Sequence, residues 1–133
     1  MNLIRNLSKL NLSLPEISFP GGNYQSVNVR QNIVYVAIQF PIKNGKYLFI
    51  GSLGDEITTQ QGCKALELCT LNVLSQIHDK IGFENVIGLN HIDICYRATN
   101  NWDESPIIAN RASELFSKAL GEKGNHSRSI YGI

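Results

Sequence analysis

The feature that most constrains the fold is one long amphipathic helix, predicted over residues 58–81. Its inward-facing side chains recur at intervals of three and four residues, which places them along one face. They are Cys63, Leu66, Thr70, Val73, Leu74, Ile77 and Ile81. Thr58 or Thr59 can cap the first turn, and Gly82 is suited to ending the helix. Such a helix must bury its apolar face against another layer.

The segments around this helix define the fold class. A second helix is predicted over residues 107–120, and a short amphipathic helix contains Leu3, Ile4, Leu7 and Leu10. Strands are predicted at residues 24–30, 33–40, 47–50, 86–98 and 127–133, with turns at Gln31-Asn32 and Asn44-Gly45. After the first helix the order is β-β-β-α-β-α-β, which indicates an α+β fold. We expect a mixed sheet with two helices packed on one face.

The length and layer count predict one domain and an assembly. We expect residues 1–133 to form a single domain, in which residues 1–13 are an N-terminal helical extension. Helices on one face leave the other face of the sheet uncovered, and we expect it to expose Val34, Val36 and Ile38. An apolar face of this kind favours association with further copies of the chain.

Composition excludes several classes of function. Hydrophobic residues make up 43% of the chain and charged residues 17%, as in ordinary globular proteins. The net charge of +1, with no Lys/Arg cluster, argues against a nucleic-acid-binding surface. No apolar run reaches the length of a membrane span. Cys63, Cys69 and Cys95 lack the spacing of metal ligands and are expected as free thiols, which favours a cytoplasmic location. His91 and Asp93 share a strand face, but two residues make no metal site.

Arg128 is the clearest candidate for a binding residue. It stands at the head of the last apolar run, directly after a turn rich in Gly, Asn and Ser. Its planar guanidinium can hold a small carboxylate through two parallel hydrogen bonds. The alternative interpretation is a surface salt bridge. His126 lies two residues earlier and is either a general base or a structural residue of the turn.

Several short segments carry a family resemblance, and the last two are the most specific. In chain order they are Leu14-Pro15 with Gly22-Asn23-Tyr24, residues 34–41, Gly51-Ser52-Leu53-Gly54, residues 65–74, residues 109–115 and residues 121–129. From about residue 3 to residue 133, the chain resembles the RidA/YjgF family, and more closely its branch of longer members with an N-terminal helix.

This resemblance implies a chorismate-mutase-like fold and a homotrimer with ligand clefts between subunits. It also implies hydrolytic deamination of reactive 2-enamines and 2-imines to 2-keto acids and ammonia, with no metal or organic cofactor. Other members of the family have been described as endoribonucleases or translation inhibitors.

The resemblance also assigns roles to residues. Arg128 matches the catalytic-site arginine that binds the substrate carboxylate, Tyr24 matches an aromatic residue lining the cleft, and Asn110 matches a polar residue near it. Ala37 and Ile38 stand where the family commonly has serine and glycine, so a hydroxyl is lost and bulk is gained. The family's last strand, which carries a glutamate, has no counterpart in the sequence.

Three functional hypotheses follow. The first is an imine deaminase, impaired by the changes at Ala37 and Ile38. The second is a non-catalytic protein that binds a small carboxylate or 2-keto acid in trimer clefts. Endoribonuclease activity is a weaker third hypothesis, because no basic strip or His/Glu dyad supports it. Arg128 is compatible with the first two hypotheses.

Overall fold

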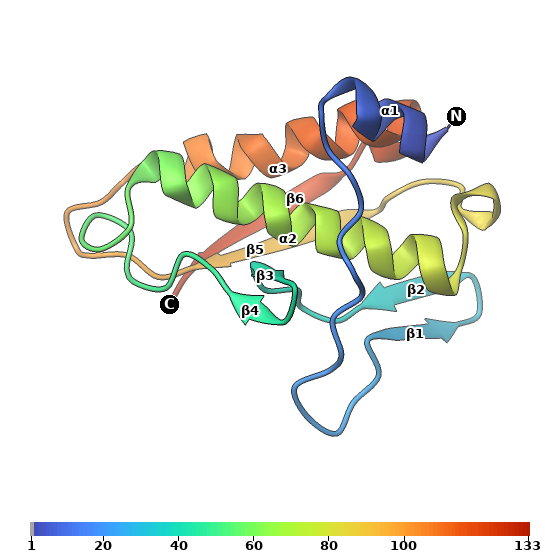
Figure 1. Ribbon diagram of the computed structural model, residues 1–133, viewed down its shortest axis with the longest axis horizontal. Helices are drawn as coiled ribbons and strands as arrows, with labels where there is room; N and C mark the ends of the chain where they lie inside the picture. Colours follow the sequence, from blue (N-terminus) through green and yellow to red (C-terminus); the bar gives the residue numbers. More distant parts are fainter. Residues whose placement is uncertain (1) are drawn as a thin grey trace.

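The computed structural model describes residues 2–133, so Met1 of the predicted extension lies outside the described residues. Two helices lie side by side against strands on one side, and a third, short helix packs at one end (Figure 1). The elements are α1 (Leu3–Lys9), β1 (Val27–Arg30), β2 (Ile33–Val36), β3 (Ile42–Lys43), β4 (Lys46–Tyr47), α2 (Thr59–Lys80), η1 (Phe83–Asn85), β5 (His91–Tyr96), α3 (Ser105–Leu120), η2 (Gly121–Gly124) and β6 (Ser127–Gly132).

The long helix α2 begins and ends close to the predicted positions. Thr58 is its N-cap: the Gln61 N–H donates to Thr58 Oγ1 at 3.1 Å, and the Thr58 N–H donates to Gln61 Oε1 at 2.9 Å. This reciprocal capping box satisfies two backbone donors that a helix start leaves free. Gly82 follows the helix with φ +83°, a conformation that favours glycine. The predicted start and stop signals are confirmed.

The face of α2 opposite the predicted apolar face is also covered. The connector between α1 and β1 crosses this helix on its outer side (Figure 1). Ser75 donates to the Pro15 carbonyl at 2.7 Å, and Gln76 Nε2 donates to the Ser18 carbonyl at 2.9 Å. These polar side chains can be buried because their donors bond to backbone carbonyls of the connector. The spacing of apolar residues in the sequence does not reveal such contacts.

The main core lies where the three helices meet. Leu74 of α2 and Ala119 of α3 are fully buried, and Leu7 of α1 is buried against the same cluster. Asn6 fixes α1 in place by donating from Nδ2 to the Ala119 carbonyl at 2.8 Å. Burying a leucine side chain stabilises a fold by about 1.5–3 kcal/mol. The predicted N-terminal helix is therefore part of the core, although Ile4 faces solvent.

The second predicted helix begins slightly earlier than expected. We predicted this helix from residue 107, whereas α3 starts at Ser105 and contains Pro106 in its first turn. A proline is tolerated there because the first N–H groups of a helix have no intrahelical partner. Gly121, with φ +63°, is the C-cap at which the helix ends.

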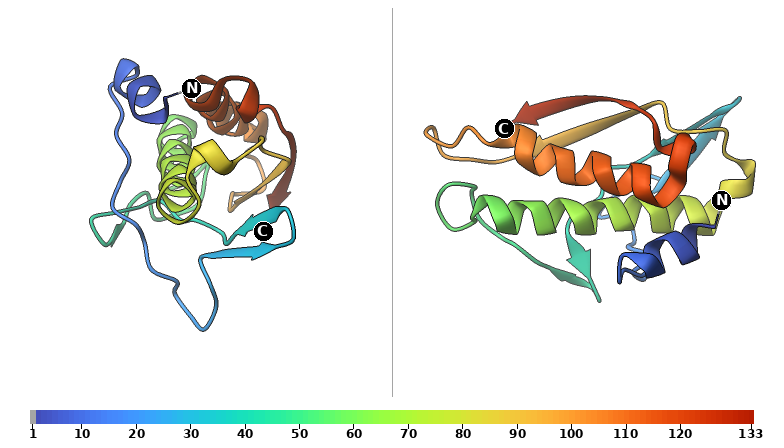
Figure 2. Two further views of the ribbon diagram at one scale, coloured as in Figure 1. Left: turned by 90° about the vertical axis from the view of Figure 1, so that its right-hand side faces the viewer. Right: turned by 90° about the horizontal axis from the view of Figure 1, so that it is seen from above.

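The strands form three two-stranded sheets instead of one continuous sheet, so the predicted continuity was wrong. The β1–β2 and β3–β4 pairs are antiparallel hairpins, and β5–β6 is a parallel pair with His91 opposite Ser127. The α+β class and the helices on one side are as predicted. Figure 2 shows α2 and α3 side by side, with β5 and β6 along one side of them.

Two predicted strands are shorter than expected. β2 ends at Val36, although the Ala37 N–H still donates to the Ser26 carbonyl at 2.9 Å. Further along, the carbonyls of Phe40 and Ile42 accept hydrogen bonds from the Asn72 side chain of α2 at 2.9 and 3.0 Å. The predicted strand over residues 47–50 is only Lys46–Tyr47, because Phe49 has φ +58° and breaks the extended run. The Asn44-Gly45 turn between β3 and β4 is confirmed, with positive φ at both residues.

The residues of β2 that face outward are Ile33 and Tyr35, not Val34 and Val36 as predicted. Val36 packs against the helical core and Val34 is half-buried, whereas Ile33 and Tyr35 face outward, with 44% and 58% of their surface exposed. Because alternate residues of a strand point to opposite faces, this one-residue shift exchanges the two sets. Ile38 is exposed, as expected. The uncovered surface therefore still carries large apolar side chains.

Among residues 2–133, no helix has both the length and the apolar character needed to cross a lipid bilayer.

Candidate functional site

Arg128 projects from β6 and is half-buried. Its Nη1 donates to Ser113 Oγ of α3 at 3.0 Å. It takes part in none of the ion pairs formed within residues 2–133. Several guanidinium N–H groups thus remain able to bind an anion. No carboxylate of residues 2–133 forms the salt bridge that the alternative interpretation of Arg128 requires.

His126 lies between η2 and β6 and has a hydrogen-bond partner at each ring nitrogen. Nδ1 is 2.5 Å from the Gly124 carbonyl oxygen, and Nε2 is 2.9 Å from Ser113 Oγ. A carbonyl oxygen only accepts, so in the neutral ring Nδ1 carries the proton and donates it. Nε2 then has a free lone pair that accepts the Ser113 hydroxyl. The Phe116 ring meets the imidazole edge-on, with centroids 5.9 Å apart, and holds its plane.

These groups line an open pocket, named here the Arg128 pocket. Its lining residues are Ser113, Ser117, Asn125, His126 and Arg128. All the side chains are polar, and they come from α3 and from the segment leading into β6. The pocket can therefore bind and orient a small polar or anionic molecule.

The tight turn at η2 gives the pocket its shape. A side-chain carbon built on Gly124 would lie 2.4 Å from the Phe116 carbonyl oxygen of α3. Only glycine lets this turn approach the helix so closely. Lys123 supports the turn from outside by donating from Nζ to the Phe83 carbonyl at 2.9 Å. The close approach brings His126 within hydrogen-bonding distance of Ser113.

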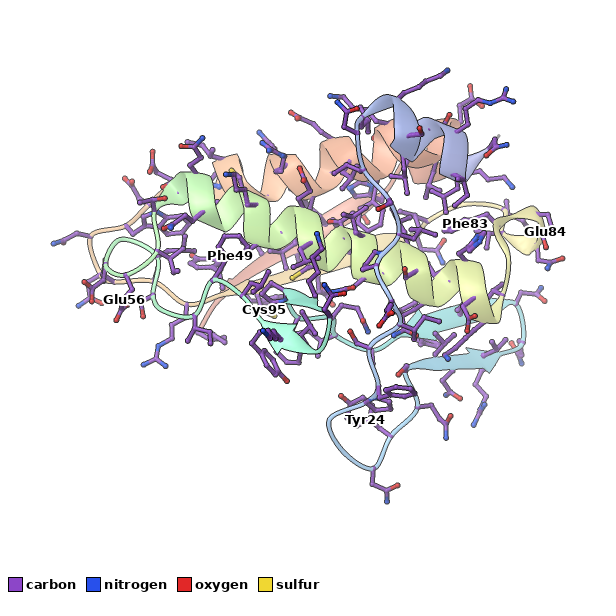
Figure 3. The ribbon with its side chains drawn as sticks, in the orientation of Figure 1. Tyr24, Phe49, Glu56, Phe83, Glu84 and Cys95 are labelled. Atoms are coloured by element: carbon purple, nitrogen blue, oxygen red, sulfur yellow. The ribbon has the colours of Figure 1, made fainter. Side chains whose placement is uncertain are left out.

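Three of the predicted site residues lie elsewhere in the chain. Tyr24, Ala37 and Ile38 line a second, small depression, named here the Tyr24 hollow. The other lining residues are Ser18, Phe19, Pro20, Gly21, Ser26, Gln39, Phe40, Ile42 and Tyr47. Figure 3 shows Tyr24 on the loop before β1, on the side of α2 away from α3. Within a single chain the two depressions share no residue.

The Tyr24 hollow is mainly apolar surface and backbone. The Tyr24 hydroxyl accepts a hydrogen bond from the Gly21 N–H at 3.1 Å, which fixes the ring. Gln39 Nε2 donates to the Ala37 carbonyl at 3.0 Å. Behind the hollow, α2 buries Asn72 and Gln76, whose carbonyl oxygens Oδ1 and Oε1 have no hydrogen-bond partner within residues 2–133.

Asn110 lies outside both depressions. It is exposed on α3, one turn before Ser113. The residue that reaches Arg128 and His126 from this helix is Ser113, which the sequence analysis did not single out. The available signal was helical spacing, because a residue three positions after Asn110 shares its side of the helix.

A second polar group lies on the uncovered face of β5 and β6. His91 Nδ1 is 2.6 Å from Ser127 Oγ, and Nε2 is 3.1 Å from Ser129 Oγ and 3.2 Å from Asp93 Oδ1. These side chains are adjacent because the parallel register sets His91 opposite Ser127 and Asp93 opposite Ser129. Throughout residues 2–133, no three His, Cys, Asp or Glu side chains gather in a way that could hold a metal ion.

The fold and the Arg128 pocket define an α+β protein with a polar pocket between a helix and a neighbouring strand. Residues 5–133 match the model of a family described as "YjgF/chorismate mutase-like, putative endoribonuclease". The chain belongs to the YjgF/chorismate mutase-like family.

Individual relatives agree with this assignment. Protein TCP17 of Trypanosoma cruzi is 28% identical over 130 residues, which span 96% of this chain and 81% of that protein. The crystal structure of a protein described as a putative endoribonuclease from Shewanella oneidensis matches over all of this chain and 89% of that one, with a TM-score of 0.95 and 28% identity. A protein of unknown function from Agrobacterium tumefaciens gives a TM-score of 0.88 at 27% identity, over 98% of this chain and 80% of that one. The predicted chorismate-mutase-like fold is confirmed.

Proposed function

We propose that this protein binds a small 2-imino or 2-keto carboxylate in the Arg128 pocket and hydrolyses reactive 2-imines there slowly. The observation that carries the proposal is the half-buried guanidinium of Arg128, which has only a serine hydroxyl as a side-chain partner within residues 2–133. A carboxylate can accept two parallel hydrogen bonds from such a group. Asn125 and Ser117 in the same pocket offer further polar contacts.

Hydrolysis of a bound imine would make modest demands on the protein. A protonated imine is already electrophilic, so the protein has to hold it and orient a water molecule for attack. The carbinolamine that forms then collapses to a 2-keto acid and ammonia. His126 Nε2 and Ser113 Oγ face the same pocket and can take part in orienting this water.

The Tyr24 hollow supports the slow rate in this proposal. Ala37 has no hydroxyl, and the exposed Ile38 side chain adds bulk where the resemblance places serine and glycine. The two depressions could form one cleft only if copies of the chain assemble, and we propose a homotrimer for this reason. Apolar side chains on the uncovered surface, such as Tyr35 and Ile38, are suited to such contacts.

A second candidate is a binding protein without turnover, for which the same Ala37 and Ile38 positions are the supporting observation. Two of the matches are described as putative endoribonucleases, but this activity has less support in the present chain than the two candidates above. The chain has 12 Lys and Arg against 11 Asp and Glu, which is a weak basis for holding a polyanionic backbone.

Calorimetric titration with pyruvate and 2-oxobutanoate tests the binding proposal. Arg128→Ala should weaken binding by about 1.5–3 kcal/mol, the range for a hydrogen bond to a charged group. Arg128→Lys should also weaken it, because an ammonium lacks the planar fork. Arg111→Ala is the matched control, since Arg111 lies on α3 and pairs with Glu67 at 3.1 Å outside the pocket. Equal affinity in wild type and Arg128→Ala would move the site elsewhere.

Two further measurements separate the candidates. Keto acid formation from freshly generated 2-iminobutanoate distinguishes slow turnover from binding alone. Light scattering should give about three times the chain mass, because the proposed cleft needs neighbouring copies. A monomer at micromolar concentration would contradict the cleft while leaving the Arg128 pocket as a site within one chain.

A further inference from the structure

The Ser113 hydroxyl has an arrangement that the binding of a carboxylate does not require. Its oxygen is 2.9 Å from His126 Nε2 and 3.0 Å from Arg128 Nη1. The arginine can only donate, so Ser113 Oγ accepts from it. The hydroxyl proton is then directed to the free lone pair of His126 Nε2. A serine with its proton aimed at a histidine is the pairing that activates a hydroxyl as a nucleophile.

The histidine is itself oriented by a third group. The Gly124 carbonyl accepts the proton on Nδ1, which fixes the tautomer that leaves Nε2 free. The edge-on contact with Phe116 holds the ring plane. A nucleophile, a base and a group that orients the base are the three parts of the serine–histidine–acid arrangement. A backbone carbonyl occupies the position of the acid here.

Arg128 supplies the remaining requirement of acyl transfer. When a serine oxygen attacks a carbonyl carbon, negative charge develops on the carbonyl oxygen, about one bond beyond the new bond. The guanidinium borders Ser113 Oγ, so its remaining N–H groups can reach that oxygen. The charge of Arg128 also favours the partly ionised serine of the transition state.

We propose that Ser113 is the nucleophile of an acyl-transfer site that hydrolyses small, uncharged carboxylic esters. The Ser113 Oγ–carbon bond forms as the hydroxyl proton passes to His126 Nε2, and the bond to the leaving alcohol breaks as that proton is returned to it. Water then attacks the acyl-serine, giving one proton to His126. The carboxylic acid leaves, and Ser113 regains its proton. No oxidant or reductant is required.

The other serine–histidine contacts of the chain lack these features. Ser127 lies 2.6 Å from His91, but Ser129 and Asp93 share the other nitrogen of that ring, and the group lies on the exposed face of β5 and β6. Ser127 Oγ is also within hydrogen-bonding distance of the Asn90 carbonyl. Only the Ser113 group combines an oriented histidine, an adjacent cation and a pocket within residues 2–133.

Covalent labelling tests the nucleophile directly. A small alkyl fluorophosphonate forms an oxygen–phosphorus bond with an activated serine and releases fluoride. Intact-mass measurement of the wild type should show one adduct, which peptide mapping should place on Ser113. Ser113→Ala should label at least tenfold more slowly. Ser127→Ala is the matched control, because this serine lies 2.6 Å from His91 Nδ1 and outside the Arg128 pocket. It should label like the wild type.

A second pair of variants keeps the test informative if Ser113→Ala is poorly folded. His126→Gln retains a polar side chain but removes the base, so labelling should slow at least tenfold. In Ser113→Cys, the introduced thiol should react with iodoacetamide faster than Cys95, the exposed thiol of β5. Turnover of p-nitrophenyl acetate should follow the same order among the serine and histidine variants.

Two results would overturn the proposal: no adduct on Ser113 in the folded wild type, or equal labelling of the wild type and His126→Gln. Neither result bears on the binding of 2-keto acids, which is measured separately by titration. Conversely, labelling of Ser113 in a protein that binds no 2-keto acid would leave the acyl-transfer proposal standing and overturn the proposed function.

Discussion

The Arg128 pocket and the Tyr24 hollow differ in what makes them. Reactive side chains line the first, and they all come from the last quarter of the chain. The second is lined by a mixture of apolar and polar residues from the connector before β1, the segment after β2 and the β3–β4 hairpin. Chemistry in the first depends on hydrogen bonds between neighbours. The shape of the second depends on the side-chain amides of Asn72 and Gln76 in α2, which are distant in sequence from the residues that line it.

This difference separates two ways in which a site can be damaged. The Arg128 pocket needs a tight turn to bring Arg128, His126 and Ser113 together, so small changes in backbone position are costly there. The Tyr24 hollow needs a buried side-chain donor to hold its backbone, since Asn72 of α2 donates to the carbonyls of Phe40 and of Ile42, the first residue of β3. Substitutions can therefore be chosen to disturb one region and spare the other.

The largest expected effect is that of Gly124→Ala. The new methyl group would overlap the Phe116 carbonyl at 2.4 Å, and two backbone segments would have to separate. We expect a loss of about 3 kcal/mol of stability, the upper part of the range for overpacking. Keto acid affinity should also fall, because Gly124 orients His126. Urea denaturation and calorimetric titration measure the two effects.

Gly22→Ala in the Tyr24 region is the matched control for this substitution. A methyl group there would lie 3.4 Å from the Tyr24 ring, an ordinary contact. Stability should change by about 0.5 kcal/mol or less, as for surface substitutions in general. Equal losses in the two variants would show that the close approach at Gly124 does not hold the pocket together.

Asn72→Ala should have the next largest effect, confined to the Tyr24 hollow. The substitution leaves the Ile42 carbonyl without its side-chain donor, whereas the Phe40 carbonyl keeps the Ile42 N–H at 2.8 Å. An unsatisfied buried group costs about 1–3 kcal/mol. We expect about 2 kcal/mol, because the unpaired Oδ1 of Asn72 is removed at the same time. Affinity for 2-keto acids should stay at the wild-type value. A loss of affinity would mean that the two regions are coupled.

The same contrast explains what could be predicted from the sequence. Helix α2 and the Asn44-Gly45 turn follow from local sequence signals. For the helix these are the spacing of its apolar residues and its capping residues, and for the turn the tolerance of Asn and Gly for positive φ. Arg128 was identified from its residue type and position, and His126 as one of two interpretations. Ser113 was missed because its importance comes from a contact with residue 128, across the turn at Gly124. The hydrogen bonds of Asn72 to the Phe40 and Ile42 carbonyls were missed because they join residues that lie 32 and 30 positions apart in the sequence.

The parity of β2 gives a second lesson of this kind. Its residues from Ile33 to Val36 are all apolar, so the sequence shows no alternation from which to choose a buried face. The choice is made by packing, since Val36 contacts the helical core. Where both faces of a strand carry apolar residues, sequence pattern gives the strand but not its orientation.

A smaller effect on stability is expected for the double substitution Ala37→Ser with Ile38→Gly. The glycine should cost about 0.5–1 kcal/mol through backbone entropy, since the Ile38 side chain is 56% exposed and adds little burial. Affinity for 2-keto acids should not change. Imine hydrolysis should become faster if the Tyr24 hollow of one copy completes the Arg128 pocket of another. An unchanged rate in a trimeric protein would indicate that Arg128 acts without this hollow.

The smallest expected effect concerns Glu56, which lies in the loop before α2, at the opposite end of the molecule from Phe83 and Glu84 (Figure 3). Its Oε1 accepts the Ser52 N–H at 2.8 Å, and this bond is the main reason that the pKa of the carboxyl is lowered from its ordinary value of 4.5. The unfolded chain therefore binds a proton more readily than the folded one. The resulting stability is present above pH 4.5 and is lost as the pH falls through the lowered pKa.

Glu56→Gln should remove this dependence, because an amide does not titrate in this range. The urea midpoint of the variant should lie slightly below that of the wild type at neutral pH, and the difference should shrink as the pH falls below 4.5. Glu114→Gln, at an exposed position of α3 without a hydrogen-bond partner in residues 2–133, should show no such convergence. Lys123, in the turn that shapes the Arg128 pocket, bonds to Phe83 at the other end of the molecule from Glu56, so Glu56→Gln should leave binding at Arg128 unchanged. A change in that binding would mean that the loop before α2 reaches the Arg128 pocket, and the pocket could not then be treated as a local unit of α3 and β6.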